Sequence, residues 1–459
     1  MTTTDRPRPP SVDRLLSILA AELVEVSERD ALVDLVRAVL AEERQRLAAG
    51  AAPAREGDLA DAVVDRLEQF GDPELTIPPH VINATGVVLH TNLGRAPWPR
   101  AARVAAVAAA RSYGYLELDE ATGRRGPRFR AVEDHLVALT GADDAMVVTN
   151  NAAALALAVG LAGRRGSIVV SRGELVEIGG GVRIPEILAR AGVRLIEVGT
   201  TNRTRAADFE EPVAGGRAKV VLRVHPSNFA IRGFTEAPDP AEVATLAHDH
   251  GAIVIDDLGS GALLETTTFG LAHEPTPTER LAAGADLVLF SGDKLVGGPQ
   301  AGLIVGRSDL VARLRRDPFA RAVRPDKAIL AGVAATLAIY RAGRAALDIP
   351  VWQLIGRDVA ELRTRAQWIV GVVGSSRVAV VDLQSTIGGG SLPGQVLPSI
   401  GVAIRVPAPT RALAALRRGP NRILARIVDD AVAFDLRTVD LLADGVIAQR
   451  IGELAARSE

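Results

Sequence analysis

Lys294 is the residue whose type and surroundings point most directly to chemistry. It is one of only three lysines among 459 residues, in a chain that uses arginine for almost all of its positive charge. It follows the apolar run Ala285 to Phe290 and precedes the glycine-rich turn at Gly297 and Gly298. A lysine amine forms an imine with an aldehyde, and an arginine does not. A lysine at the end of a strand, followed by such a turn, therefore predicts a covalent site for pyridoxal phosphate, with a solvated surface lysine as the alternative.

Two adjacent aspartates follow a second apolar run and supply a partner for this cofactor. A carboxylate just past a buried strand can hold a protonated pyridine nitrogen and keep the ring electron-withdrawing. Asp256 and Asp257 are both candidates, and we favour Asp257 because it leads into the turn Leu-Gly-Ser-Gly261. Capping of the next element is the alternative interpretation.

The cofactor phosphate has two candidate binding segments. Asn150, Asn151 and Ala152 follow the run Ala145 to Thr149 and open a helical pattern, and the free N–H groups of a helix start bind phosphate. Ordinary capping by asparagine explains the same pattern. Ser291, three residues before the lysine, is the second candidate.

Charged residues near these segments suit proton transfer and anion binding. Asp293 is adjacent to the lysine, where it can tune the amine pKa or handle the proton of a leaving hydroxyl. Arg95, Arg321 and Arg324 lie in arginine-containing turns, and guanidinium groups suit a tetrahedral oxyanion. Surface ion pairs are the alternative role for each arginine.

Composition excludes several classes of function. The absence of cysteine excludes disulfides, iron–sulfur clusters, thiolate zinc sites and cysteine nucleophiles. The seven histidines are scattered, so we expect no metal site. A formal net charge of −2 gives no general attraction for nucleic acid, which local patches would have to hold. With no signal-peptide core and no run of ~18 apolar residues, we expect a cytoplasmic protein without a membrane span.

The elements that must position these residues divide into three predicted domains. Residues 1–78 form a small helical domain, because leucines such as Leu15 and Leu19 recur at helical spacing. The first 80 residues of the chain hold nine arginines and sixteen acidic residues, a formal net charge of −7. Residues 79–329 form a large α/β domain, and residues 330–459 form a smaller α+β domain that closes over the site.

The large domain alternates short β-branched runs with helical segments, which predicts an α/β fold with a mostly parallel central sheet. In such sheets ligands bind beyond the carboxyl ends of the strands, where the candidate residues lie. The predicted strands are Ala145 to Thr149, Ser167 to Ser171, Arg194 to Val198, Lys219 to Val224, Ala252 to Asp256, Ala285 to Phe290 and Leu303 to Val305, with further runs at Val378 to Val381 and Val402 to Val406 in the third domain.

Taken in order, these segments resemble the bacterial selenocysteine synthases, or L-seryl-tRNA(Sec) selenium transferases, which are fold-type I pyridoxal-phosphate enzymes. The resemblance runs from about Pro10 to near the C-terminus. The segments that carry it are Val81 to Arg95, Gly123 to Gly126, Ser171 to Gly179, Glu197 to Thr204, the Asp257 segment, Phe290 to Lys294, Gly388 to Pro393 and Asp435 to Thr438.

The resemblance implies roles for five residues. The catalytic lysine of the family falls on Lys294 and its neighbouring aspartate on Asp293. The oxyanion-binding arginines fall on Arg95, Arg321 and Arg324. Lys294 would release pyridoxal phosphate to the amine of seryl-tRNA(Sec) and remove the α-proton, and the hydroxyl would leave. Selenophosphate, held by the three arginines, would then add to the resulting aminoacrylyl ester.

The resemblance also implies an assembly and a way of holding the tRNA. Members of the family form rings of dimers, typically homodecamers, with active sites at dimer interfaces. Their N-terminal helical domain grips the tRNA, although here that domain is acidic. The segment 171–187 offers no aromatic side chain to stack on the cofactor ring, so the stacking residue is not identified.

Two other functions compete with this interpretation. The first is a related pyridoxal-phosphate lyase that acts on a small amino acid or amino sugar without tRNA. Such relatives tend to lack the helical N-terminal domain, which favours the transferase. The second is a catalytically silent scaffold that binds tRNA, and it is disfavoured because the lysine, the aspartates and the three arginines are all present.

Overall fold

The computed structural model describes residues 8–20, 29–71, 77–126, 128–178, 181–418 and 421–456. The chain divides into two compact units, residues 1–80 and residues 81–459. Of the segments that carry the resemblance, Gly179 lies outside the described residues. Across the described ranges, no helix has the length and apolar character needed to cross a membrane.

The first unit consists of helices. They are α1 (Val12–Leu19), α2 (Arg29–Ala48) and α3 (Glu56–Gly71). The Ser11 side chain caps α1 by accepting a hydrogen bond from the Arg14 N–H. Leu15 and Leu19 are fully buried against apolar residues of α2 and α3, so the predicted leucine spacing does form the inner face of this unit.

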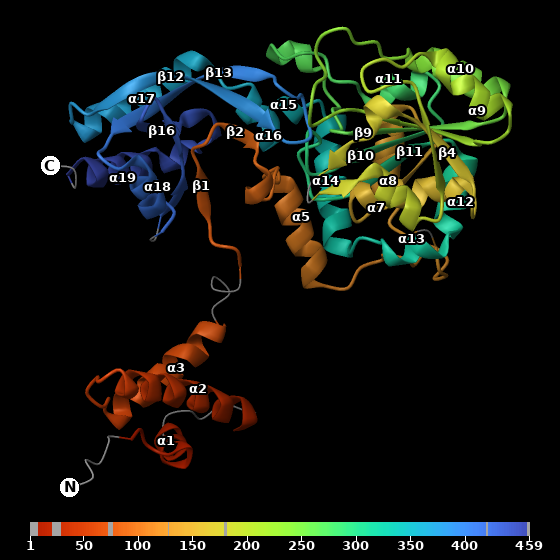
Figure 1. Cartoon of the computed structure of the whole chain (residues 1–459). Coiled ribbons are helices and arrows are strands. Elements are labelled where there is room, and N and C mark those ends of the chain that lie inside the picture. The colour runs from red at the N-terminus through yellow and green to blue at the C-terminus, as the bar shows by residue number, and fades with distance from the viewer. Residues whose placement is uncertain are drawn as a thin grey trace. The chain divides into compact units, whose positions relative to one another are not determined.

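A seven-stranded sheet forms the centre of the large α/β region (Figure 1). Strands β10, β9, β8, β4 and β7 run parallel, whereas β11 is antiparallel to both of its neighbours. This arrangement confirms the predicted mostly parallel sheet. In spatial order the strands are β3 (Asp144–Val148), β11 (Gly302–Gly306), β10 (Leu287–Ser291), β9 (Ile253–Gly259), β8 (Val220–Val224), β4 (Ser167–Ser171) and β7 (Arg194–Val198).

Both faces of this sheet are covered by helices, which explains the uninterrupted apolar runs in its strands. Along β10, Val288 and Phe290 pack into one hydrophobic core, and Leu287 and Leu289 pack into another on the opposite face. The first core includes side chains of α6 (Ala131–Thr140), α14 (Lys327–Arg341) and α16 (Pro350–Ile355), and the second those of α7 (Asn151–Ala158), α8 (Ile184–Arg190) and α12 (Ser308–Arg316).

A second, five-stranded sheet is built mainly from the C-terminal part of the chain. Its order is β15 (Arg426–Val428), β16 (Ala431–Asp435), β13 (Val396–Arg405), β12 (Val378–Gly388) and β2 (Val87–Leu89). Strand β2 pairs in parallel with β12, and β1 (Val81–Asn83) pairs in parallel with β14 (Arg422–Leu424). The first strands after the helical unit therefore pair with strands that come some 300 or more residues later.

The other elements are helices and one separate pair of strands. Helices α17 (Val359–Val373), α18 (Pro409–Leu416) and α19 (Asp444–Ala456) pack on the second sheet. The remaining elements are α5 (Arg100–Arg111), α9 (Glu210–Ala214), α10 (Pro240–Asp249), α11 (Pro277–Ala282), α13 (Pro318–Ala322), α15 (Ala345–Asp348) and the hairpin strands β5 (Glu177–Ile178) and β6 (Val182–Arg183).

The predicted division at residues 329 and 330 stays a prediction. Helix α14 spans this position, and its residues Val333 and Leu337 belong to the core of the large sheet. The predicted end of the N-terminal domain at residue 78 comes just after residues 72–76, which lie outside the described residues.

One fully buried carboxylate, Asp435, accepts hydrogen bonds from several parts of the C-terminal sheet. Its oxygens accept hydrogen bonds from Ser385 Oγ at 3.0 Å, Ser399 Oγ at 2.6 Å, Arg426 Nη2 at 2.9 Å and the Arg437 N–H at 3.2 Å. A buried charge is tolerated only when it is paired and hydrogen-bonded in this way. The motif that begins at Asp435 thus has a structural role in the fold.

We predict that Asp435→Ala destabilises the protein strongly, because it leaves the buried hydroxyls of Ser385 and Ser399 and the partly exposed Arg426 guanidinium without this acceptor. The expected loss is about 3–5 kcal/mol, measured as a shift in the urea unfolding midpoint. Asp382→Ala is the control, since Asp382 lies in the same sheet in an exposed pair with Arg363 and should cost less than about 1 kcal/mol. Equal small shifts for both variants would show that Asp435 is not the structural centre of the sheet.

Candidate functional site

A cavity of about 260 Å³ contains Lys294 and lies at the carboxyl ends of the parallel strands. Strands β8, β9 and β10 and the turn after β3 all contribute to it, because parallel strands end at the same edge of a sheet. Most of the predicted site residues meet here. The lining residues are Arg95, Asn150, Asn151, Ala152, Leu155, Val176, Val224, His225, Ser227, Asp257, Gly259, Ser291, Asp293, Lys294 and Gln300.

Lys294 is partly buried in the turn after β10. Burial lowers the pKa of its amine, and the nearby positive charge of Arg95 lowers it further. The carboxylates of Asp257 and Asp293 act in the opposite direction but do not cancel these effects. The amine is therefore neutral, and hence nucleophilic, at a lower pH than an ordinary lysine.

The structure places Asp257, and not Asp256, in this cavity. Asp257 is buried, and burial raises its pKa to about 6 even though Asn151 Nδ2 donates to its Oδ1 at 2.7 Å. Asp256 faces Arg280 instead, with 3.6 Å between the charged atoms. Consecutive residues of a strand point to opposite faces, which is why only one member of the pair reaches the cavity.

Asp293 and Arg95 form an ion pair at the edge of the cavity. The Arg95 Nη1 to Asp293 Oδ2 distance is 2.7 Å, and the Ala96 N–H donates to the Asp293 carbonyl at 3.3 Å. Arg95 adopts a left-handed backbone conformation with φ of 63°, which costs of order 1–3 kcal/mol in a residue with a side chain. The surrounding structure holds this arginine in a strained position beside the lysine.

The two predicted phosphate-binding segments both reach the cavity. Asn150 caps α7, and its side chain accepts a hydrogen bond from the Ala153 N–H at 2.9 Å. Asn151 and Ala152, in the first turn of α7, line the cavity wall together with Ser291 at the end of β10. Asn150 is therefore a helix cap, and phosphate binding by the free N–H groups of this helix start stays a prediction.

Gly390, which comes from the C-terminal part of the chain, lies directly against the Lys294 amine. A side-chain Cβ at this position would lie 2.6 Å from Lys294 Nζ and 2.9 Å from its Cε. Gly390 has φ of 86°, a conformation that favours glycine. The segment Gly388 to Pro393 carries part of the family resemblance, and its glycine gives the backbone close access to the reactive amine.

Sequence reasoning missed several residues of the cavity, among them His225, Ser227 and Gln300. His225 directly follows the predicted strand Lys219 to Val224, so its position at a strand end was an available signal. Its Nε2 atom lies 3.4 Å from Glu274 Oε1, and both atoms are buried without a hydrogen bond in the described structure. Such unsatisfied buried groups are typical of sites that a ligand or water completes.

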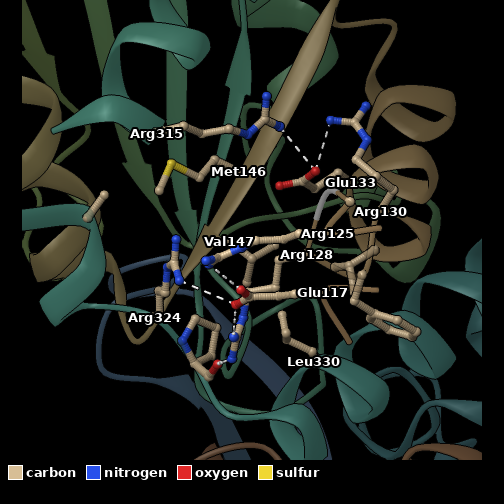
Figure 2. A pocket seen from close by; sticks show the side chains of 15 residues that line it. Glu117, Arg125, Arg128, Arg130, Glu133, Met146, Val147, Arg315, Arg324 and Leu330 are labelled. Carbon is tan, nitrogen blue, oxygen red and sulfur yellow. Dashed lines mark hydrogen bonds and ion pairs between the residues drawn. The ribbon is translucent and has the colours of Figure 1, made fainter. Parts of the chain in front are cut away.

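Arg321 and Arg324 do not line the lysine cavity. Arg321 is an exposed residue of α13. Arg324 lines a separate cavity of about 470 Å³, shown in Figure 2 with its ion pairs, and its Nη1 lies 3.3 Å from Glu117 Oε1. The two cavities share no lining residue. Within one chain the predicted arginine trio is therefore not assembled around Lys294.

One group of described residues has the composition of a metal site. Glu265, His273 and Glu279 are exposed, and the two ring nitrogens of His273 lie 3.1 Å and 3.2 Å from the two carboxylates. Hydrogen bonding to Glu265 is the main reason that the pKa of His273 is raised. Each nitrogen already faces a carboxylate, so the geometry is that of a surface ion-pair group.

Comparison with known proteins gives one consistent family. The family model for L-seryl-tRNA selenium transferase matches residues 81–440. The L-seryl-tRNA(Sec) selenium transferase of Rhizobium meliloti (strain 1021) is 45% identical over 440 residues, which is 93% of each chain. That of Moorella thermoacetica is 44% identical over 439 residues, 94% of this chain and 93% of the relative.

Among solved structures, a D-glucosaminate-6-phosphate ammonia-lyase has a similar fold. The TM-score is 0.61 at 21% sequence identity, covering 86% of this chain and 98% of that chain. This likeness bears on the fold alone, and it agrees with the predicted fold-type I architecture.

We predict that attachment of pyridoxal phosphate to Lys294 depends less steeply on pH than attachment to an unperturbed lysine, because the pKa of its amine is lowered. For an unperturbed lysine, the neutral fraction of the amine falls about tenfold for each pH unit below its pKa of about 10.4. A lowered pKa keeps a larger fraction neutral at the same pH. Attachment to cofactor-free protein, measured by borohydride reduction and peptide mapping, should slow by clearly less than ~100-fold between pH 9 and pH 7. Arg95→Gln should steepen this dependence, and a full ~100-fold decline in the wild type would contradict the lowered pKa.

We predict that Gly390→Ala slows cofactor attachment by at least about tenfold, because the new methyl group strains the backbone and displaces the Lys294 amine. The matched control is Gly389→Ala, whose Cβ would meet only Thr91 Oγ1, at 3.3 Å. The measurement is the growth of cofactor absorbance in cofactor-free protein, with the melting temperature as a check on folding. Equal rates in the two variants would argue against close coverage of the amine by Gly390.

Proposed function

We propose that this chain, which belongs to the L-seryl-tRNA selenium transferase family, converts seryl-tRNA(Sec) to selenocysteinyl-tRNA(Sec). The observation that carries the proposal is 45% identity to a transferase of this activity over 93% of both chains. The cavity around Lys294 supports the proposal as well. It brings together a lysine amine that can form an imine with the cofactor and the buried Asp257 carboxyl group that can hold the ring nitrogen.

Pyridoxal phosphate, the predicted cofactor, is the cofactor that this family implies, and the residues of the lysine cavity fit it. Lys294 offers an amine whose pKa is lowered by burial, and Asp257 offers a buried carboxyl group for a ring nitrogen. The Asn151 Oδ1 atom is buried and lacks a hydrogen bond in the described structure, so a bound group has an acceptor to satisfy. When bound, the cofactor supplies an electron-withdrawing ring that stabilises negative charge at the seryl α-carbon.

The side chains around the amine then divide the proton transfers. We assign Lys294 to hold the cofactor, to release it to the seryl amine and to take the α-proton with its freed Nζ. Asp293, paired with Arg95, is placed to manage the proton of the leaving hydroxyl. Ser291 and the N–H groups of Asn151 and Ala152 are assigned to the cofactor phosphate, beside the capping residue Asn150.

The selenium donor is selenophosphate, which we assign to the arginines Arg95, Arg321 and Arg324. Tetrahedral oxyanions suit guanidinium groups because several N–H donors point in one plane. Arg95 lines the lysine cavity, and the other two lie elsewhere on the same chain. We therefore propose that the site is completed in an oligomer, a ring of dimers such as a homodecamer, in which a second copy supplies Arg321 and Arg324.

The remaining assignments concern the partner RNA and the compartment. We propose that the helical unit, residues 1–80, contacts the tRNA through local basic side chains or with help from another subunit, because its overall balance is acidic. A tRNA substrate also favours a cytoplasmic protein.

We predict that Lys294→Ala abolishes conversion of seryl-tRNA(Sec), with a loss of at least about 10³-fold, because the covalent attachment and the α-carbon base are removed together. Lys219→Ala is the control, since Lys219 is exposed and lies outside the lysine cavity. The measurement is selenocysteinyl-tRNA(Sec) formed from radiolabelled seryl-tRNA(Sec) and selenophosphate.

The same protein separates the competing functions. In the transferase, seryl-tRNA(Sec) perturbs the cofactor absorbance and free serine does not. A response to serine alone would indicate the related lyase. A spectrum that is unchanged in Lys294→Ala would indicate a scaffold without a covalently bound cofactor.

A further inference from the structure

Glu117 gathers three arginines in the 470 Å³ cavity described above. Its Oε2 atom is 2.6 Å from Arg125 Nη2, and its Oε1 atom is 2.6 Å from Arg128 Nη1 and 3.3 Å from Arg324 Nη1. Figure 2 shows the Glu117 carboxylate between the guanidinium groups of Arg128 and Arg324. Three cations and one anion leave a local surplus of two positive charges.

The Glu117 carboxylate is held by shorter hydrogen bonds from Arg125 and Arg128 than the one it accepts from Arg324. Hydrogen bonding from Arg128 is the largest reason that the pKa of Glu117 is lowered, so this carboxyl stays ionised at neutral pH. Arg128 also donates from Nη2 to the Pro325 carbonyl at 2.8 Å, and Lys327 Nζ donates to the Ser112 carbonyl at 2.6 Å. These bonds join the segment that carries Glu117 to the turn that carries Arg324.

Arg324 itself remains available for another ligand. Its side chain is 36% exposed, and Glu117 engages only the Nη1 group, at the long distance of 3.3 Å. Among the described residues, no other hydrogen bond of the Arg324 guanidinium is present. A guanidinium has five N–H donors, so most of this set is still free for an anion.

The second charge cluster of the cavity is balanced and does not share this property. Arg130 and Arg315 are both bound by Glu133 and by Asp144, and Arg130 also lies 3.5 Å from Asp134, so this cluster holds no surplus of positive charge. In Figure 2 this cluster is drawn apart from the Glu117 group, with its own ion pairs. The surplus charge of the cavity is therefore concentrated around Glu117.

We propose that Glu117 is a positioning residue that holds Arg324 with its free N–H donors directed toward the oxyanion of the selenium donor. The inference rests on the proposed function, in which Arg324 binds selenophosphate. Glu117 does not line the cavity of Lys294, so in this proposal it acts through Arg324. Its carboxylate restricts the guanidinium to one place without occupying all of its donors, which reduces the ordering cost when the anion binds.

The test compares selenophosphate kinetics in Glu117→Gln, Glu133→Gln and Arg324→Ala in the full-length, cofactor-loaded protein. Glu117→Gln keeps the shape of the side chain but removes the charge that orients Arg324. We expect its KM for selenophosphate to rise about three- to fivefold, as for loss of a partly exposed ion pair, with kcat within about twofold. Glu133→Gln removes a charge from the same cavity and should leave this KM unchanged.

Two further readouts distinguish positioning from a general structural defect. The absorbance change on adding seryl-tRNA(Sec) without selenophosphate should be the same in Glu117→Gln and wild type, since the inference concerns only the second substrate. In the double variant Glu117→Gln/Arg324→Ala, the KM should be no higher than in Arg324→Ala alone, because Glu117 acts through Arg324.

The outcomes separate this inference from the function on which it rests. If Arg324→Ala raises the KM and Glu117→Gln does not, the positioning role is wrong and the oxyanion role of Arg324 stands. If Glu133→Gln raises the KM as much as Glu117→Gln, general cavity charge is responsible and the inference is overturned. If Arg324→Ala leaves selenophosphate use unchanged while conversion of seryl-tRNA(Sec) proceeds, both the arginine assignment and this inference fail, and the transferase activity itself is upheld.

Discussion

The burial of one amine beside one carboxylate is the constraint on which this structure depends. Lys294 and Asp257 are each held in a protonation equilibrium shifted by burial, the first toward the neutral amine and the second toward the neutral acid. Both shifts cost folding free energy in the unliganded protein, because each charged form is disfavoured where it lies. A protein retains such groups when a ligand uses them, and a ring with a cationic nitrogen and an electrophilic carbon uses both.

The sheet topology explains how such distant residues meet. Asp257 lies near the end of β9, His225 follows β8 and Lys294 follows β10, and these three parallel strands are neighbours in the sheet. Buried Tyr340 supports the lysine turn, because its hydroxyl oxygen lies 3.0 Å from the carbonyl oxygens of both Leu295 and Val296 and accepts a hydrogen bond from Trp352 Nε1. Helices α14 and α16 thus support the turn that carries Lys294, and the carboxyl ends of the strands stay open to ligands.

Much of this could be predicted from the sequence, and the limits have physical causes. Apolar runs identified the strands of the large sheet to within one or two residues at most ends, because a strand buried on both faces has a local signature. Asp257, Asn151 and Ser291, which were chosen because each lies at or near a strand end, all line the cavity of Lys294, and their roles stay predictions. The contribution of Gly390 could not be found in the same way, because its contact with Lys294 depends on a chain segment almost 100 residues away. The pairing of β2 with β12 and the separate location of Arg324 are likewise long-range results of tertiary structure, which no local pattern encodes.

The position of Gly390 has a consequence for the order in which the molecule is made. Strand β12 ends at Gly388, and its parallel partner β2 leads into the turn of Arg95, which pairs with Asp293 beside the lysine. The neighbours that hold β12 in place extend to β16, which ends at Asp435. A growing chain therefore possesses all strands of the large sheet well before the segment that covers its lysine amine has been made.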